Sequence, residues 1–297
     1  MLYNNLSSYL KERYSKKIKK LCIDGGFSCP NRDGRCGVGG CIFCGERGAG
    51  EHIDPTLSIA EQVRVSLERG TGDGYIAYFQ SFTNTYAPPN VLRERYDAAL
   101  TDERIVALAI GTRPDCIDEE IAALIAEYKS RLDVWVELGL QTSSDKTAKR
   151  INRGYNGDTF ERAMEILTRY GIPAVVHLII GLPGEGDKEL ADTVDFINRF
   201  PLLGVKIHSL YVSEGTRLAE EYRRGEFTPI GMDEYVERAA YVITHISPDI
   251  TVHRLTGDCP KGMLVAPEWN VKKNEIIAAI NARLASRGER QGCYYQE

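Results

Sequence analysis

The chain has 297 residues, of which 43% are hydrophobic and 27% are charged. This is the composition of an ordinary globular protein, and it excludes the collagen-like and disordered classes. With 37 basic and 42 acidic residues the net charge is −5, which argues against non-specific binding of nucleic acid. The apolar run Val175–Ile180 is far shorter than the roughly 20 residues of a membrane helix, and the N-terminus lacks a signal-peptide pattern. We therefore expect a cytoplasmic protein that makes no membrane contact.

Positive charge is nevertheless concentrated in residues 11–20. Such a segment can contact phosphates even when the total charge is negative, but a solvated helix face explains it equally well. A second, weaker basic stretch lies near the C-terminus, over residues 272–290. The basic residues of the first segment are Lys11, Arg13, Lys16, Lys17, Lys19 and Lys20.

The eight cysteines are unevenly distributed, and five of them fall between residues 22 and 44. In a cytosolic chain of this size such a group indicates a metal site or catalysis before it indicates disulfides. Cys29, Cys36, Cys41 and Cys44 could close a structural zinc site. Alternatively, three of the cysteines could hold an iron–sulfur cluster and leave one iron open to a ligand. The Cys41–Cys44 pair fits both metals, so the cysteines alone leave the two sites open.

Beyond the cysteines, β-rich runs alternate with amphipathic segments in six successive units. This alternation predicts βαβ crossovers and a parallel sheet. The predicted strands are Lys20–Asp24, Tyr75–Gln80, Val106–Gly111, Val134–Leu140, Ala174–Ile180 and Val205–Tyr211. The predicted helices between them are Ser58–Arg69, Val91–Leu100, Glu119–Ser130, Asp158–Tyr170 and Lys188–Phe200.

The predicted fold class is α/β, a partial (β/α)6 TIM-type barrel with a C-terminal extension. Residues 1–250 would form the barrel, and residues 251–297 would pack on it as an extension with a strand at Thr251–Leu255 and a helix at Lys273–Ser286. In such folds the chemistry lies at the C-terminal ends of the strands. The cysteine loop follows the first strand, so we expect it at that end.

Three motifs give the chain a strong resemblance to the radical S-adenosylmethionine (SAM) enzymes over about residues 15–260. Gly139-Leu140-Gln141, followed by Asn152-Arg153, resembles the GxQ…NR element of oxygen-independent coproporphyrinogen oxidase. Leu178–Glu185 is similar to the family's GLPGE-type turn, and Thr112–Asp115 resembles the TRPD of the elongator catalytic subunit's radical domain.

The nearest resemblance is to small bacterial radical SAM proteins with the motifs CPNRDG…GGCxFC, YFQSxTNTYAP and HRLTGD. It implies a [4Fe–4S] cluster on Cys29, Cys41 and Cys44, with one iron free to bind SAM. Eleven residues separate the first two cysteines here, where the family usually has three. Cys22 and Cys36 fall outside the family's pattern.

The resemblance also implies residues that contact SAM. Gln141 and Arg153 would meet its ribose and carboxylate regions, although Arg153 could instead form a surface salt bridge. Glu137 shares a strand face with Gln141, so it would point inward or form a structural ion pair. Backbone carbonyls and the side chain of Asn84 or Thr83 would replace the family's Gly-Gly-Glu contact to the amino group of SAM. His177 would face the adenosine or be a core histidine. No catalytic residue is assigned.

The function implied by the resemblance is reductive cleavage of SAM to a 5′-deoxyadenosyl radical. Within the nearest group, the substrate would be the wobble uridine of tRNA, whose C5 side chain changes from carboxymethylaminomethyl to aminomethyl. The partners would be tRNA, contacted by the basic segments, and an electron donor such as flavodoxin or ferredoxin. Because fold does not determine the substrate, a small molecule or a tetrapyrrole-like compound is an alternative. A zinc-stabilised nucleic-acid-binding protein without catalysis is an alternative of another class.

Overall fold

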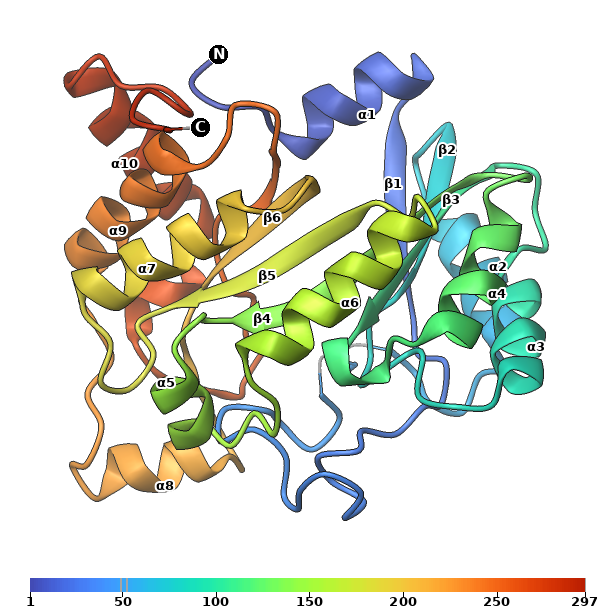
Figure 1. Cartoon of the computed structure of the whole chain (residues 1–297), viewed down its shortest axis with the longest axis horizontal. Helices are drawn as coiled ribbons and strands as arrows, with labels where there is room; N and C mark the ends of the chain where they lie inside the picture. Colours follow the sequence, from blue (N-terminus) through green and yellow to red (C-terminus); the bar gives the residue numbers. More distant parts are fainter. Residues whose placement is uncertain (49, 52, 297) are drawn as a thin grey trace.

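The computed structural model describes all residues except 49, 52 and 297, and its centre is a curved, seven-stranded parallel sheet (Figure 1). The strand order is β1-β2-β3-β4-β5-β6-β8, and every neighbouring pair is parallel. The strands are β1 Ile18–Ile23, β2 Gly74–Phe79, β3 Ile105–Thr112, β4 Asp133–Gln141, β5 Ala174–Ile180, β6 Leu202–Ser209 and β8 Thr251–Arg254. A small antiparallel pair joins β7 Val212–Ser213 to β9 Leu264–Ala266.

The predicted fold class is confirmed, with one strand more than the six expected in the barrel. Thr251–Leu255, expected to open the extension, forms β8 and pairs in parallel with β6. The sequence separates these two strands by some forty residues that include two helices, so no local pattern showed that they would pair. The boundary predicted at residue 250 thus falls at the start of a strand that belongs to the same sheet.

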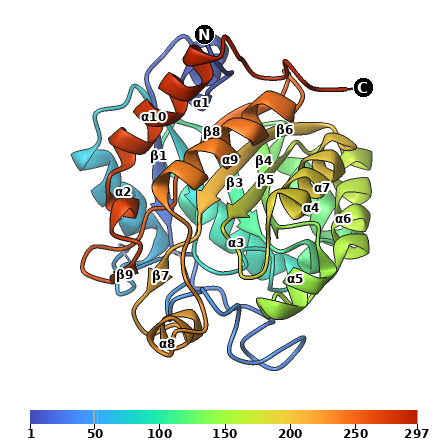
Figure 2. The ribbon, with the colours of Figure 1, turned by 90° about the vertical axis from the view of Figure 1, so that its left-hand side faces the viewer.

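Helices cover the outer face of the sheet (Figures 1 and 2). Their apolar residues recur every three or four positions, as at Phe160, Ala163, Met164 and Leu167 of α6, so one face of each helix is buried. The helices are α1 Leu6–Tyr14, α2 Ile59–Arg69, α3 Pro89–Ala99, α4 Glu119–Tyr128, α5 Asp145–Arg150, α6 Gly157–Arg169, α7 Asp187–Asn198, α8 Arg217–Arg223, α9 Met232–His245 and α10 Lys273–Ser286. Short 3-10 turns lie at Pro114–Cys116 and Glu268–Val271. None of the described helices is long and apolar enough to cross a membrane.

One of the two helix starts predicted from capping residues is found in the structure, and the other lies at a different residue. Ser58 caps α2 in a capping box with Glu61, because each side chain accepts a hydrogen bond from the other residue's backbone N–H. The helix predicted from Asp158 begins one residue earlier, at Gly157, after the cap Asn156. The Asn156 side chain accepts from the Thr159 N–H, a role that Asn fills as well as Asp.

The interior of the sheet is closed at one end and open at the other. At the N-terminal ends of the strands, Leu10 of α1 packs with Ile76, Trp135 and Val175 in a small apolar cluster. At the C-terminal ends, the long loop between β1 and α2 crosses below the sheet in the view of Figure 1. This arrangement leaves a space between the cysteine loop and the strand ends.

Candidate functional site

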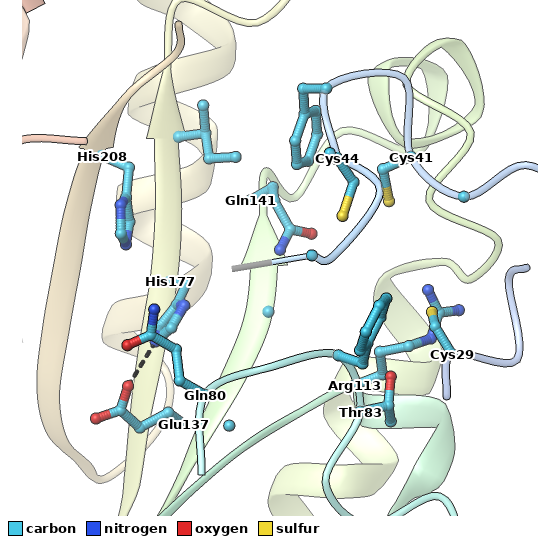
Figure 3. Close-up of a pocket in the computed structure, with 18 of the residues that line it drawn as sticks. Cys29, Cys41, Cys44, Gln80, Thr83, Arg113, Glu137, Gln141, His177 and His208 are labelled. Carbon is cyan, nitrogen blue, oxygen red and sulfur yellow. Dashed lines mark hydrogen bonds and ion pairs between the residues drawn. The ribbon is translucent and has the colours of Figure 1, made fainter. Parts of the chain in front are cut away.

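A pocket of about 300 Å³ lies between the C-terminal ends of the strands and the cysteine loop. One wall carries the cysteines, and the other carries side chains of β4, β5 and β6, with Gln141 between them (Figure 3). This is the end at which barrels of this kind place their chemistry, as predicted.

Cys29, Cys41 and Cys44 all line this pocket, and all three are free thiols. Gly39 and Gly40 adopt left-handed φ values of +77° and +73°, which let the chain turn sharply before Cys41. Arg32 then closes the loop on itself, since its guanidinium donates to the carbonyls of Cys44 at 3.2 Å and Glu46 at 2.9 Å. The loop is thereby held in a shape that presents three thiols to one space.

The arrangement of the thiols fits a cluster better than a zinc ion. Of the four cysteines considered for zinc, Cys29, Cys41 and Cys44 line the pocket and Cys36 does not. A tetrahedral zinc needs four donors on a single ion, whereas a [4Fe–4S] cluster takes each thiolate on a different iron. Cys36 is exposed and faces Asp115, with Sγ 3.5 Å from Oδ2. The three remaining cysteines fit a cluster that has one open iron.

Gln141 reaches the pocket through a strained backbone. Its φ is +62°, an uncommon value for a residue other than glycine, and the β4–β5 register shifts between Gly139 and Gln141. A Cβ on Gly139 would lie 2.6 Å from Gln141 Nε2, so a larger residue there would displace the Gln141 amide. Tyr155 holds the amide, since its hydroxyl donates to Gln141 Oε1 at 3.3 Å. Strain of this kind is typical of functional positions.

Arg153 is buried, with 1% of its surface exposed, so the alternative of a surface salt bridge is wrong. Its guanidinium donates to the carbonyls of Leu140, of Thr142 at 2.7 Å, and of Tyr155 at 3.0 and 3.1 Å. It therefore ties the end of β4 to the segment before α6. Its edge also lines the pocket.

Glu137 and His177 form a hydrogen-bonded pair in the strand wall (Figure 3). Glu137 Oε2 lies 2.9 Å from His177 Nε2 and contacts Lys206 Nζ, while Oε1 lies 3.6 Å from Lys20 Nζ. Burial alone would raise the pKa of Glu137, but the two ammonium groups hold it well below its usual range. Glu137 thus points inward and forms an ion pair, so both predicted alternatives describe it.

The titration of His177 gives a testable pH dependence. Burial, followed by the charge of Lys206, lowers the pKa of His177 from 6.5 to about 4. Between these values the unfolded chain binds a proton that the folded protein does not, so stability falls as the pH drops through this window. His177→Gln keeps a hydrogen-bond donor but removes this titration. Between about pH 7 and 4.5 we expect the free energy of unfolding to fall by about 2 kcal/mol less in His177→Gln than in the wild type. Urea unfolding at the two pH values measures the difference, and parallel losses in both proteins would contradict the assignment.

Asn84 does not line the pocket. Its side chain is completely buried and donates to the carbonyls of Phe79 at 3.2 Å and Gly111 at 2.7 Å. It fixes the turn after β2, and the neighbouring Thr83 reaches the pocket instead (Figure 3). The predicted contact of Asn84 with SAM therefore has no direct geometric support.

Several pocket residues were not predicted as site residues, among them Arg113, Tyr155 and Arg254. Arg113 makes a double hydrogen bond to Asp115, at 2.7 and 2.9 Å, and donates to the Arg153 carbonyl at 2.9 Å. Tyr155 holds Gln141, and Arg254 lies at the end of β8. The TRPD run was the signal for Arg113, while Arg254 stands within the HRLTGD motif.

Comparisons with known proteins identify the family. The model of the radical SAM superfamily matches residues 32–197, more than half of the chain, and that of the Radical_SAM C-terminal domain matches residues 202–286. The Bacillus subtilis "Uncharacterized protein YtqA" is 38% identical over 299 residues, covering 99% of this chain and 93% of the relative. The Escherichia coli "Protein YhcC" is 38% identical over 270 residues, covering 90% and 87%. A "tRNA uridine(34) acetyltransferase" of Methanocaldococcus infernus is 31% identical over 194 residues. This match covers 64% of this chain and only 35% of the relative.

Solved structures share the fold. The Methanocaldococcus infernus Elp3 structure superimposes with a TM-score of 0.70 at 21% identity, covering 93% of this chain and 64% of that one. The structure of methylornithine synthase superimposes with a TM-score of 0.52 at 13% identity. The match covers 96% of this chain and 86% of that one. Together with the family match and the three cysteines at the strand ends, these findings establish that the chain belongs to the radical SAM superfamily, enzymes that use a [4Fe–4S] cluster and SAM.

Proposed function

We propose that this radical SAM enzyme modifies the wobble uridine of tRNA, converting its carboxymethylaminomethyl side chain to aminomethyl. One observation supports radical chemistry at this site. One pocket at the strand ends is lined by Cys29, Cys41, Cys44 and Gln141. When bound, the cluster and SAM would supply a 5′-deoxyadenosyl radical, which removes one hydrogen atom from the substrate.

The residues of the pocket divide the work between holding the cofactors and shaping the site. Cys29, Cys41 and Cys44 hold the cluster, and Gln141 contacts SAM directly. Arg153 acts by fixing the segment on which Gln141 stands, since its donors are engaged with backbone carbonyls. Glu137 and His177 form the strand wall that faces the substrate.

The proposed conversion is a net two-electron oxidation. The bond between nitrogen and the carboxymethyl carbon breaks, water adds one oxygen, and the two-carbon fragment leaves as glyoxylate. One electron leaves with the hydrogen atom taken by the radical, one goes to a one-electron protein acceptor of the flavodoxin or ferredoxin class, and one proton is released. The same class of protein would supply the electron that opens the reaction.

The tRNA substrate is supported by the relatives that act on tRNA uridine 34 according to their names. These relatives are 30–31% identical to this chain, which covers 35–40% of their length, so the substrate class comes to it as a proposal. Mass spectrometry of tRNA nucleosides tests it directly. A strain lacking the gene should accumulate carboxymethylaminomethyluridine, and an unchanged nucleoside profile would reject tRNA in favour of a small-molecule substrate.

The structure changes the expected phosphate contacts. Lys20 points into the barrel, and Arg13 pairs with Asp133 at 2.8 Å, so residues 11–20 offer less free charge than their sequence indicates. In the C-terminal stretch, Arg283 pairs with Glu237 and Glu289 at 2.7 Å. The segment of residues 11–20 also begins on α1, at the edge opposite the cysteine loop (Figure 1). A uridine that enters the pocket needs cations at the other edge.

Helix α5 offers such cations, because it lies at the edge of the cysteine loop (Figure 1) and exposes Lys146 and Lys149. We expect Lys146→Glu with Lys149→Glu to weaken tRNA binding and to lower the slope of log affinity against log salt by about 2. The matched control is Lys16→Glu with Lys19→Glu at the opposite edge, which should change the slope less. Filter binding across a salt series measures both. Unchanged slopes in both variants would contradict tRNA binding at either edge.

A further inference from the structure

The strand wall of the pocket carries two cations side by side. Lys206 of β6 and Arg254 of β8 are register partners on adjacent strands, and both side chains line the pocket. Like charges directly opposite each other destabilise a sheet unless an anion compensates them. Lys206 is 3% exposed, so water compensates it little.

The anions of the protein do not balance this wall. Glu137 is shared by Lys206 and Lys20, and Asp258 is shared by Arg254 at 3.2 Å and Lys273 at 3.3 Å. Around this wall, as the structure describes it, four cations thus share two carboxylates. The other acidic side chain that lines the pocket, Glu51, belongs to the opposite wall, on the cysteine loop.

A histidine stands beside the two cations with one ring nitrogen unpartnered. His208 follows Lys206 by two residues on β6, so both side chains share a strand face. Its Nε2 is buried and finds no hydrogen-bond partner among the described residues, although buried polar atoms are rarely left so. His208 also lines the pocket, beside His177 (Figure 3).

We propose that Lys206, Arg254 and His208 form a subsite that binds the carboxylate of the substrate's side chain. An anion there would balance the excess positive charge of this wall. A guanidinium suits a carboxylate because its fork donates two parallel hydrogen bonds. The subsite lies on the wall opposite the cysteines, so it would hold the substrate across the pocket from the cluster ligands. This inference rests on the proposed function, which supplies a substrate that ends in a carboxylate.

The test compares two modified anticodon stem-loop RNAs, with the unmodified stem-loop as a reference, on the reconstituted holoenzyme with SAM present. One carries carboxymethylaminomethyluridine at the wobble position, and the other carries the methyl ester of the same side chain. Fluorescence anisotropy gives the three affinities. The wild type should bind the acid about 10- to 100-fold more tightly than the ester.

In Arg254→Met and in Lys206→Met the ratio should fall close to one. Lys273→Met is the matched control, because Lys273 shares Asp258 with Arg254 but does not line the pocket. It should keep the wild-type ratio. Should Lys206→Met fail to fold after Glu137 loses an ion partner, Arg254→Met carries the test, since its side chain is 32% exposed.

The outcomes separate the subsite from the proposed function. A wild-type ratio near one, with both RNAs bound more tightly than an unmodified stem-loop, overturns the subsite and leaves the substrate class standing. Equal binding of all three RNAs overturns the proposed function and the subsite with it. Loss of SAM affinity in Arg254→Met with an unchanged acid-to-ester ratio assigns these cations to the carboxylate of SAM and overturns the proposal.

Discussion

Replacing Cys29, Cys41 or Cys44 with Ala should abolish both the broad absorbance at ~400 nm and the cleavage of SAM. Each thiolate would bind a different iron of the cluster, so the loss of one removes a third of the protein's ligands. All three cysteines are free and line the same pocket, which leaves no spare thiol in the described pocket lining to substitute. Iron and sulfide analysis after anaerobic purification, together with the spectrum, measures the effect.

Cys36→Ala and Cys22→Ala are the matched controls, because neither residue lines the pocket. Cys36 faces Asp115 at the surface, and Cys22 lies on β1. Both variants should keep the spectrum and the cleavage of SAM. A full cluster in Cys41→Ala would contradict the ligand assignment, and loss of the cluster in Cys36→Ala would indicate a fourth ligand.

Arg153→Ala should be among the most destabilising single changes in this protein. The substitution leaves the carbonyls of Leu140, Thr142 and Tyr155 without their buried donor. An unsatisfied buried group costs about 1–3 kcal/mol, so we expect a loss of roughly 3–5 kcal/mol in the free energy of unfolding. Urea unfolding of the purified protein measures it.

Gln141→Ala is the counterpart that separates stability from SAM binding. The Gln141 side chain faces the pocket and its amide contacts Tyr155, so its removal should change stability by less than about 1 kcal/mol. SAM affinity should fall by about 10-fold, as expected for the loss of one hydrogen bond to a polar ligand. Unchanged SAM affinity in Gln141→Ala would show that SAM lies elsewhere. Unchanged stability in Arg153→Ala would contradict its positioning role.

Sequence alone determined the features of this protein that are local or periodic. The alternation of strands and helices predicted the parallel sheet, because crossovers of that length join parallel strands. The position of the cysteine loop after the first strand placed its thiols at the C-terminal edge, and Cys29, Cys41 and Cys44 line the pocket there. Gly139 and Gln141 were recognisable as a sequence motif, and the structure places the Gln141 amide against Gly139.

Tertiary structure alone decided the partners of the charged residues. The sequence indicated that Lys20 belongs to a surface patch. In the structure, β1 directs its side chain toward Glu137, which is 117 residues later in the chain. Arg153 was predicted to contact SAM or to form a surface ion pair. In the structure its guanidinium donates hydrogen bonds to carbonyls on two separate segments. Because side chains alternate along a strand, the sequence shows which residues share a face. Which of the two faces is interior depends on strands and helices far away in the sequence. For the same reason, only the pairing of β6 with β8 brought Lys206 beside Arg254.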